Sequence, residues 1–310
     1  MKPFLSYDQQ LDKLIDKNLV IDDEDTVKEQ LMYKSYFSLI GGYKSPFRDP
    51  STRKYINDST FNDILALYNF DEELRTLFFH YICTSEITIR SKLSYSFCEL
   101  HGNDQGEYLN YRNYNSNSSN NNAIRYLIRT LEYEAIENNK HEYVLHQRNR
   151  YSNVPLWVLV HTLTFGKLSK LYEFSTSQIR SSVASGFPGI SDRDLEKMLK
   201  NLVLYRNVCG HHERLYSHKV YTDFPDTVLH EKLQIPKKGN QYIYGKRDLF
   251  GVVISLRYLL HNEDFKAFKH QLTKIINNFL KSTPTVPKDW LYSEMGFPEN
   301  WIKITSYKKY

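Results

Sequence analysis

The sequence predicts an all-α protein. Three observations support this fold class. Long segments carry apolar residues at the spacing of one helix face, several of them begin at a helix-capping residue, and no segment alternates convincingly as a strand does. The clearest segment follows Thr60, and its apolar stripe consists of Phe61, Ile64, Leu65, Leu67, Tyr68, Leu74, Leu77, Phe78, Tyr81, Ile82, Ile89, Leu93 and Phe97. No internal repeat is visible.

The composition narrows the class of protein further. A chain of 310 residues can bury a sizeable core and corresponds to one large or two modest domains. Its 41 Lys and Arg against 36 Asp and Glu give a net charge of +5, which permits nucleic-acid binding but does not require it. Three widely spaced cysteines, Cys83, Cys98 and Cys209, argue against a disulfide framework or a structural zinc site. Without a signal sequence or a membrane-length apolar run, we expect a cytoplasmic protein with no membrane partner.

The N-terminal part is expected to be a helical extension, assigned to residues 1–58. Ser6 caps a helix over 6–19. The acidic run from Asp22 to Asp25 suits the start of a second helix, which we expect to end at Gly41-Gly42. A loop then leads to the core.

The helical core is assigned to residues 59–281. Residues 60–100 are expected to form one or two long helices, with Phe70-Asp71 as the candidate break. The Asn- and Ser-rich stretch 102–122 is expected to form a mobile polar loop. Further helices are expected over 123–148, from Pro155 to 174, over 177–185, from Ser191, and over 246–261 and 263–281, with a loop over 221–240. The tail 282–310 carries Trp290, Phe297 and Trp301, so we expect it to pack on the core.

Basic side chains on two of these segments are candidate RNA contacts. The helix over 123–148 and the loop after it supply Arg125, Arg129, Arg148 and Arg150, and the loop over 221–240 supplies Lys237 and Lys238. Such charges can neutralise phosphates. The alternative is that they form ordinary solvated faces.

The segment from Ser191 to Tyr216 carries the candidate chemistry. Ser191 and Asp194 form a capping box, and a stripe from Leu195 to Val203 follows at helical spacing. The next position on this stripe holds Arg206. An arginine that faces the core is unusual, because its charge must be paired or must face a polar cleft. The polar residues that come directly after it are Asn207, His211 and His212.

This set of side chains suits RNA cleavage without a metal ion. A histidine takes the proton of a ribose 2′-hydroxyl, the 2′-oxygen attacks the neighbouring phosphorus, and an arginine stabilises the charge on the phosphoryl oxygens. No acidic cluster, nucleotide-binding loop or zinc-protease motif is present, so no cofactor or metal is expected. On an ideal helix, however, Arg206 and His211 point about 140° apart. The structural alternative is that Arg206 pairs with Glu86, Glu213 or another carboxylate while the histidines are surface residues.

These residues also carry a family resemblance. Arg206-Asn207-x-x-x-His211 matches the R-x4-6-H signature of HEPN ribonucleases, and the block from Arg206 to Leu215 resembles the R-N-x-C-x-H-H-x-R-L block of Abi-like (AbiD/AbiF-type) abortive-infection proteins. Other matching segments run in family order along nearly the whole chain: Gly42-Tyr43 with Pro46-Phe47, Leu67-Tyr68-x-Phe70-Asp71-x-x-Leu74-Arg75, Glu86-Ile87-x-Ile89-Arg90-Ser91, Pro155-Leu156-Trp157, Phe165-Gly166 and Met295-Gly296-Phe297-Pro298-x-Asn300-Trp301.

The resemblance implies a HEPN-like helical core and an RNase toxin used in phage defence or a toxin–antitoxin system. It also implies that the protein forms a homodimer. Members of the family are inhibited by a small non-coding RNA, so such an RNA is a candidate partner. Arg206 would stabilise the phosphate, Asn207 would orient it, and His211 with His212 would exchange protons. The pair Glu86 and Arg90 is a candidate support shell. The rival hypothesis is a non-catalytic RNA-binding module that docks a small non-coding or antitoxin RNA.

Overall fold

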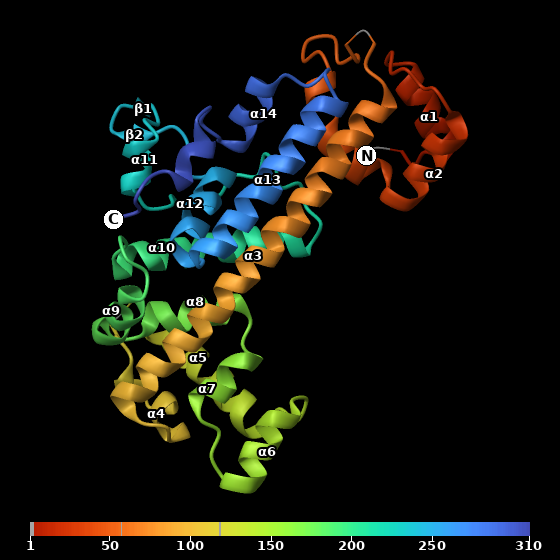
Figure 1. The fold of residues 1–310 in the computed structure, drawn as a ribbon. Coiled ribbons are helices and arrows are strands. Elements are labelled where there is room, and N and C mark those ends of the chain that lie inside the picture. The colour runs from red at the N-terminus through yellow and green to blue at the C-terminus, as the bar shows by residue number, and fades with distance from the viewer. Residues whose placement is uncertain (1–2, 57, 118) are drawn as a thin grey trace.

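The computed structural model describes residues 3–56, 58–117 and 119–310 and confirms the all-α class. Its spine is the 41-residue helix α3 (Phe61–His101), which runs through most of the length of the molecule (Figure 1). Thr60 and Asp63 form a capping box at its start. The break expected at Phe70-Asp71 is wrong, because Asp71 is buried on the core face of a continuous helix and forms an ion pair with Arg75 one turn later.

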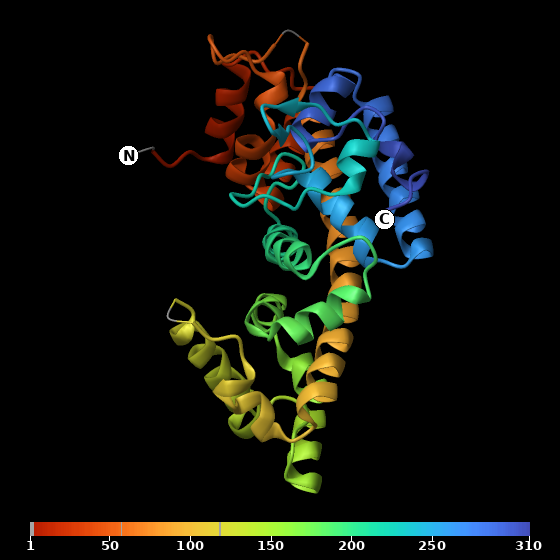
Figure 2. The ribbon, with the colours of Figure 1, turned by 90° about the vertical axis from the view of Figure 1, so that its left-hand side faces the viewer.

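The N-terminal residues pack beside the start of α3 (Figures 1 and 2). They form α1 (Tyr7–Ile15), α2 (Glu24–Lys34), the π-helix η1 (Phe37–Gly41) and the 3-10 helix η2 (Ser45–Phe47). Ser6 and Gln9 make a capping box on α1. Asp23 caps α2 by accepting from the Asp25 N–H at 3.1 Å. The assignment 1–58 includes residues 1–2 and 57, which lie outside the described part of the chain.

Helices at the far end of α3 form the lower half of the molecule in Figure 1. They are α4 (Gln105–Leu109), η3 (Tyr111–Asn113), α5 (Asn121–Glu132), the π-helix η4 (Tyr133–Glu137), α6 (Glu142–Tyr151), α7 (Leu156–Leu159), η5 (Val160–Thr162), α8 (Phe165–Phe174) and α9 (Ser177–Ser185). The prediction of a structureless loop over 102–122 is wrong in its described part, because Tyr108 and Tyr114 are buried there; residue 118 lies outside it. The single helix expected over 123–148 is divided by η4 and the turn after it.

The remaining elements fill the upper half. They are α10 (Asp192–Gly210), α11 (Val228–Lys232), the antiparallel strands β1 (Lys237–Lys238) and β2 (Gln241–Tyr242), α12 (Leu249–Leu259), α13 (Asn262–Ser282), α14 (Lys288–Met295) and η6 (Trp301–Thr305). The stretch 221–240, expected to be a loop, therefore contains α11 and the first strand of a small hairpin. Helices α10 and α13 both pack against α3.

The C-terminal tail lies against the core. Trp301 is fully buried, and its indole N–H donates to the Tyr292 hydroxyl at 3.2 Å. Gly296 ends α14 with φ of +73°, and its Cα packs so closely on the Asp248 carboxylate that a Cβ there would lie 2.1 Å from the carboxylate carbon. One hydrophobic cluster runs from Leu11 to Ile304. No helix in the described ranges is both long and apolar enough to cross a membrane.

Candidate functional site

The motif residues lie at the C-terminal end of α10, where the chain makes a sharp turn. The Glu213 N–H donates to the Val208 carbonyl at 3.0 Å, and the His212 N–H donates to the Cys209 carbonyl at 3.3 Å. This pair of bonds is the Schellman closure of a helix end, in which glycine is usual at the left-handed position. Here that position holds His212, with φ of +56°. A left-handed conformation costs a residue with a side chain about 1–2 kcal/mol, which favours a role for the imidazole itself.

A buried ionic network holds this turn in place. The Asp71 carboxylate is fully buried and accepts hydrogen bonds from the backbone N–H groups of Leu215 at 2.9 Å and Tyr216 at 2.7 Å. It also accepts from the Tyr43 hydroxyl and from the Arg75 guanidinium, each at 2.7 Å. The network therefore links the N-terminal extension, the spine and the residues that follow the two histidines.

Arg75 adds a further link to the same turn. Its Nη1 donates to the Tyr43 hydroxyl at 3.0 Å and reaches the Glu213 carbonyl at 3.4 Å. In the sequence, Arg75 stood out only within a family segment, and Asp71 only there and in the candidate break of the long helix. Their spacing of four residues and the placing of an aspartate on an apolar helix face were signals that could have found them.

The proposed support shell, Glu86 and Arg90, lies further along α3. The two side chains form an ion pair, and Arg90 also donates to the carbonyls of Val160 and Leu163. The pair therefore fixes the end of η5. The Cys83 thiol interacts electrostatically both with Glu86 of this pair and with Arg206 of the motif. Burial and the nearby Glu86 raise the pKa of the Cys83 thiol, and Arg206 opposes this rise.

Arg206 is not held by a carboxylate. Its guanidinium carbon lies 5.3 Å from the centre of the Phe79 ring on α3, in a cation–π contact. Its Nε is buried and has no hydrogen-bond partner. Throughout the described residues, no Asp or Glu lies within ion-pair distance of this guanidinium, so the pairing with Glu86 or Glu213 considered above is not found.

Two cavities meet the end of α10. One, of about 520 Å³, lies between α3 and α10 and is lined by Phe79, Cys83, Cys209, Gly210 and His212 among others. The other, of about 610 Å³, lies on the side of η1 and is lined by His211, His212, Arg214 and Lys219 among others. His212 thus faces both cavities. Arg206 lies against Phe79 on the α3 side, whereas His211 lines the η1 side.

The thiols at the first cavity are poor nucleophiles. Burial raises the pKa of Cys209 to about 12, with Asp71 as the next cause, so this thiol is protonated at neutral pH. The Cys83 thiol is also shifted upward. They therefore contribute apolar lining to the cavity.

Asn207 is exposed on the solvent side of α10. Its backbone carbonyl accepts the His211 N–H at 2.8 Å. Its side chain makes no hydrogen bond with the described residues, so the amide is free to meet a ligand beside His211.

The six basic residues assigned to RNA contact are not brought together. Arg125 stacks on Tyr111 at 4.9 Å, and Arg129 and Arg150 are exposed on α5 and α6. Three nitrogens of Arg148 bind the end of η4 through the carbonyls of Ala135 and Asn138 and the side chain of Asn139. Lys237, which lies over Tyr242 at 4.4 Å, and Lys238 belong to the hairpin at the opposite end of the molecule (Figure 1).

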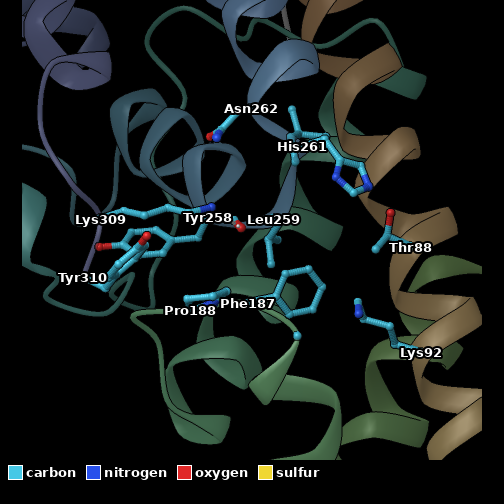
Figure 3. A pocket seen from close by; sticks show the side chains of 12 residues that line it. Thr88, Lys92, Phe187, Pro188, Tyr258, Leu259, His261, Asn262, Lys309 and Tyr310 are labelled. Atoms are coloured by element: carbon cyan, nitrogen blue, oxygen red, sulfur yellow. Dashed lines mark hydrogen bonds between the residues drawn. The ribbon is translucent and has the colours of Figure 1, made fainter.

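A third cavity, of about 390 Å³, contains none of the motif residues. Figure 3 shows Thr88 and Lys92 of α3 on one side of it and Tyr258, Lys309 and Tyr310 on the other. The Lys309 ammonium donates to the carbonyls of Arg257 and Tyr258, both at 3.2 Å. The C-terminal tail therefore forms one wall of this cavity, which is not the candidate site.

Comparison with known proteins identifies the family. The family model described as Abi-like protein matches residues 29–217. The match includes the buried network, Arg206 and both histidines. No curated protein and no solved structure matches the chain. Since the matched region covers more than half of the sequence, the protein belongs to the Abi-like family.

Proposed function

We propose that the protein is an endoribonuclease that cleaves RNA without a metal ion, of the HEPN type that the motif resembles. Membership of the Abi-like family indicates a role in abortive infection, a form of phage defence. The observation that carries the proposal is the Arg206 guanidinium, which has no carboxylate partner among the described residues and lies against Phe79, beside a cavity that Phe79, Cys83 and His212 line. A half-buried cation without a carboxylate is a site for an anion, and a phosphodiester is the anion that a neighbouring histidine can help to cleave.

The chemistry requires one base, one acid and one charge stabiliser. A neutral imidazole of His211 or His212 takes the proton of the 2′-hydroxyl, and the 2′-oxygen forms a bond to phosphorus. The bond from phosphorus to the 5′-oxygen breaks, and the other imidazole, protonated, supplies the proton of the departing oxygen. Arg206 stabilises the phosphoryl oxygens. The products are a 2′,3′-cyclic phosphate and a 5′-hydroxyl.

The same proposal includes a homodimer. Within one chain, Arg206 lies on the α3 side of α10 and His211 on the η1 side. A two-fold axis beside the end of α10 would place the arginine of one chain opposite the histidines of the other, because such an axis brings the same patch of both chains together. The exposed side chains of Asn207, His211 and His212 are then available at the interface.

Replacing the histidines is expected to abolish cleavage without unfolding the protein. His211→Ala and His212→Ala should each lower the cleavage rate by about 10²–10⁴-fold, the usual contribution of a general acid or base. His270→Ala, an exposed histidine on α13, is the matched control. The measurement is cleavage of a long RNA in EDTA. If both single variants and the double variant keep the full rate, the mechanism is wrong. Binding of RNA without cleavage by the native protein would assign the docking function instead.

Mixing two inactive variants tests the shared site. Arg206→Ala chains and His211→Ala/His212→Ala chains are unfolded together, refolded and assayed. Random pairing gives heterodimers with one intact site, so roughly a quarter of the native activity should return. Each variant refolded alone is the control. A native protein that light scattering shows to be an active monomer would contradict the shared site.

A further inference from the structure

The N-terminal extension contains a strongly basic hollow, which we call the N-terminal basic pocket. It has a volume of about 540 Å³ and is lined by the cations Lys13, Lys17, Lys44, Arg48 and Arg53. Asp49 is the sole carboxylate among the described lining residues. Lys13, Lys17, Lys44 and Arg48 are half-buried, so their charges lie close together and partly out of water.

Hydrogen bonds to backbone groups assemble this pocket. The Tyr55 N–H donates to the Lys17 carbonyl at 2.8 Å, which joins the end of α1 to the hairpin-like turn over residues 48–55. Arg48 and Tyr55 form an antiparallel bridge at the base of that turn. The Arg48 Nε donates to the Arg53 carbonyl at 2.6 Å. The fold therefore holds these cations together although they repel one another.

The single carboxylate is occupied by its own turn. Asp49 accepts from the Ser51 N–H at 2.7 Å, the Ser51 hydroxyl at 2.6 Å and the Thr52 N–H at 3.0 Å. These hydrogen bonds, that of the Ser51 hydroxyl first, lower the pKa of Asp49 to about 2. Burial lowers the pKa of Lys17, and Arg48 is the next cause. The pocket thus keeps an excess of positive charge that a bound anion would stabilise.

We propose that the N-terminal basic pocket binds phosphate groups of the RNA backbone. Phosphate oxygens accept hydrogen bonds from arginine and lysine, and their charge matches that of the pocket. Unlike the sequence-predicted basic residues on α5, α6 and the β1–β2 hairpin, the cations here line one cavity.

Its position explains why the ligand is RNA. The segment from Tyr36 to Ser45 separates this pocket from the cavity of His211: Tyr36 and Lys44 line the first, while Phe37 and Gly42 line the second. The Arg214 Nη1 donates to the Gly42 carbonyl at 2.8 Å and so connects this segment to the residues after α10. A strand that leaves the histidines can pass from one cavity to the other.

An exposed aromatic ring lies on the same path. Phe37 is 86% exposed although it lines the His211 cavity. A base can stack on such a ring without sequence preference. The identity of the ligand as RNA rests on the proposed function, whereas the preference for a phosphate rests on the positive charges of Lys13, Lys17, Arg48 and Arg53, which line the pocket.

The test is binding of a 2′-O-methyl oligonucleotide, which 2′-hydroxyl attack cannot cleave, measured by fluorescence anisotropy over a range of salt. Lys13→Gln/Lys17→Gln is expected to raise Kd at least tenfold. It should also lower the slope of log Kd against log salt by about 1.4, since each lost single-strand phosphate contact contributes about 0.7. Lys274→Gln/Lys303→Gln removes the same charge from exposed positions on α13 and η6 and should bind as the native protein does.

Two further arms make the result decisive. Arg53→Gln changes an exposed cation of the pocket and should weaken binding in the same direction, which excludes misfolding of α1 as the cause. Inorganic phosphate at matched ionic strength should not displace the oligonucleotide at micromolar concentration. Unchanged Kd and slope in the pocket variants, or displacement by micromolar phosphate, would overturn the assignment to RNA. Because no cleavage is needed, these outcomes are distinct from a failure of the proposed nuclease activity.

Discussion

Asp71→Ala is expected to lower the free energy of unfolding by about 3–5 kcal/mol, the usual cost of removing one partner of a buried ion pair. The substitution leaves the Arg75 guanidinium buried without its carboxylate, and the N–H groups of Leu215 and Tyr216 lose their acceptor. Any folded protein that remains should have a disordered His211–His212 turn and should cleave RNA poorly.

The measurement is denaturant unfolding followed by circular dichroism. Glu73→Ala removes an exposed carboxylate two residues away on the same helix and is the matched control, with an expected change within about 0.5 kcal/mol. The loss of unfolding free energy in Tyr43→Phe should lie between those of Asp71→Ala and Glu73→Ala, because Asp71 keeps its other hydrogen-bond donors. Native-like stability of Asp71→Ala would show that this network does not hold the turn.

Arg206→Ala is expected to reduce RNA cleavage by about 10²–10³-fold, the usual loss for one donor that stabilises developing charge. The free energy of unfolding should change by no more than about 1 kcal/mol, since the side chain makes no ion pair with the described residues and loses its contacts with Phe79 and the Cys83 thiol. Arg206→Lys keeps the charge but not the planar fork, so it should recover part of the activity.

Arg75→Ala is the informative contrast to Arg206→Ala. It removes an arginine that is bound to Asp71, and it should destabilise the fold as strongly as Asp71→Ala does. Arg206→Ala is thus expected to lose activity while it keeps its stability, whereas Arg75→Ala is expected to lose stability. If Arg206→Ala unfolds the protein as readily as Arg75→Ala, the arginine is structural and the proposed role is wrong.

Local sequence signals predicted the helices and their starts well. The capping boxes at Ser6, Thr60 and Ser191 are all present, because a cap depends on residues within one turn of one another. Of the one or two helices expected over 60–100, the structure has one, and the candidate break at Phe70-Asp71 is absent because Asp71 is stabilised by Tyr43 and by backbone groups more than 140 residues away in sequence. The buried Tyr108 and Tyr114 show why the polar stretch near them is not a loop throughout.

The candidate site was only partly accessible from the sequence. The spacing of Arg206, His211 and His212 predicted the proposed chemistry, and the structure places all three residues near the C-terminal turn of α10. The support of this turn by Asp71 and Arg75 depends on tertiary contacts, which no local pattern reports. The N-terminal basic pocket was also missed, because its cations come from α1 and the residues just after it, from Lys44 and from the turn over 48–55, which meet only in the folded chain.

Product analysis of RNA with single 2′-deoxy substitutions tests the central claim most directly. The protein is incubated in EDTA with labelled RNA of one sequence, in which one cleaved nucleotide at a time lacks its 2′-hydroxyl. We expect cleavage to stop only at the substituted nucleotide and all other products to carry 2′,3′-cyclic phosphate and 5′-hydroxyl ends. Cleavage at the deoxy position, or products with 5′-phosphate ends, would contradict attack by the 2′-oxygen and with it the roles given to Arg206, His211 and His212.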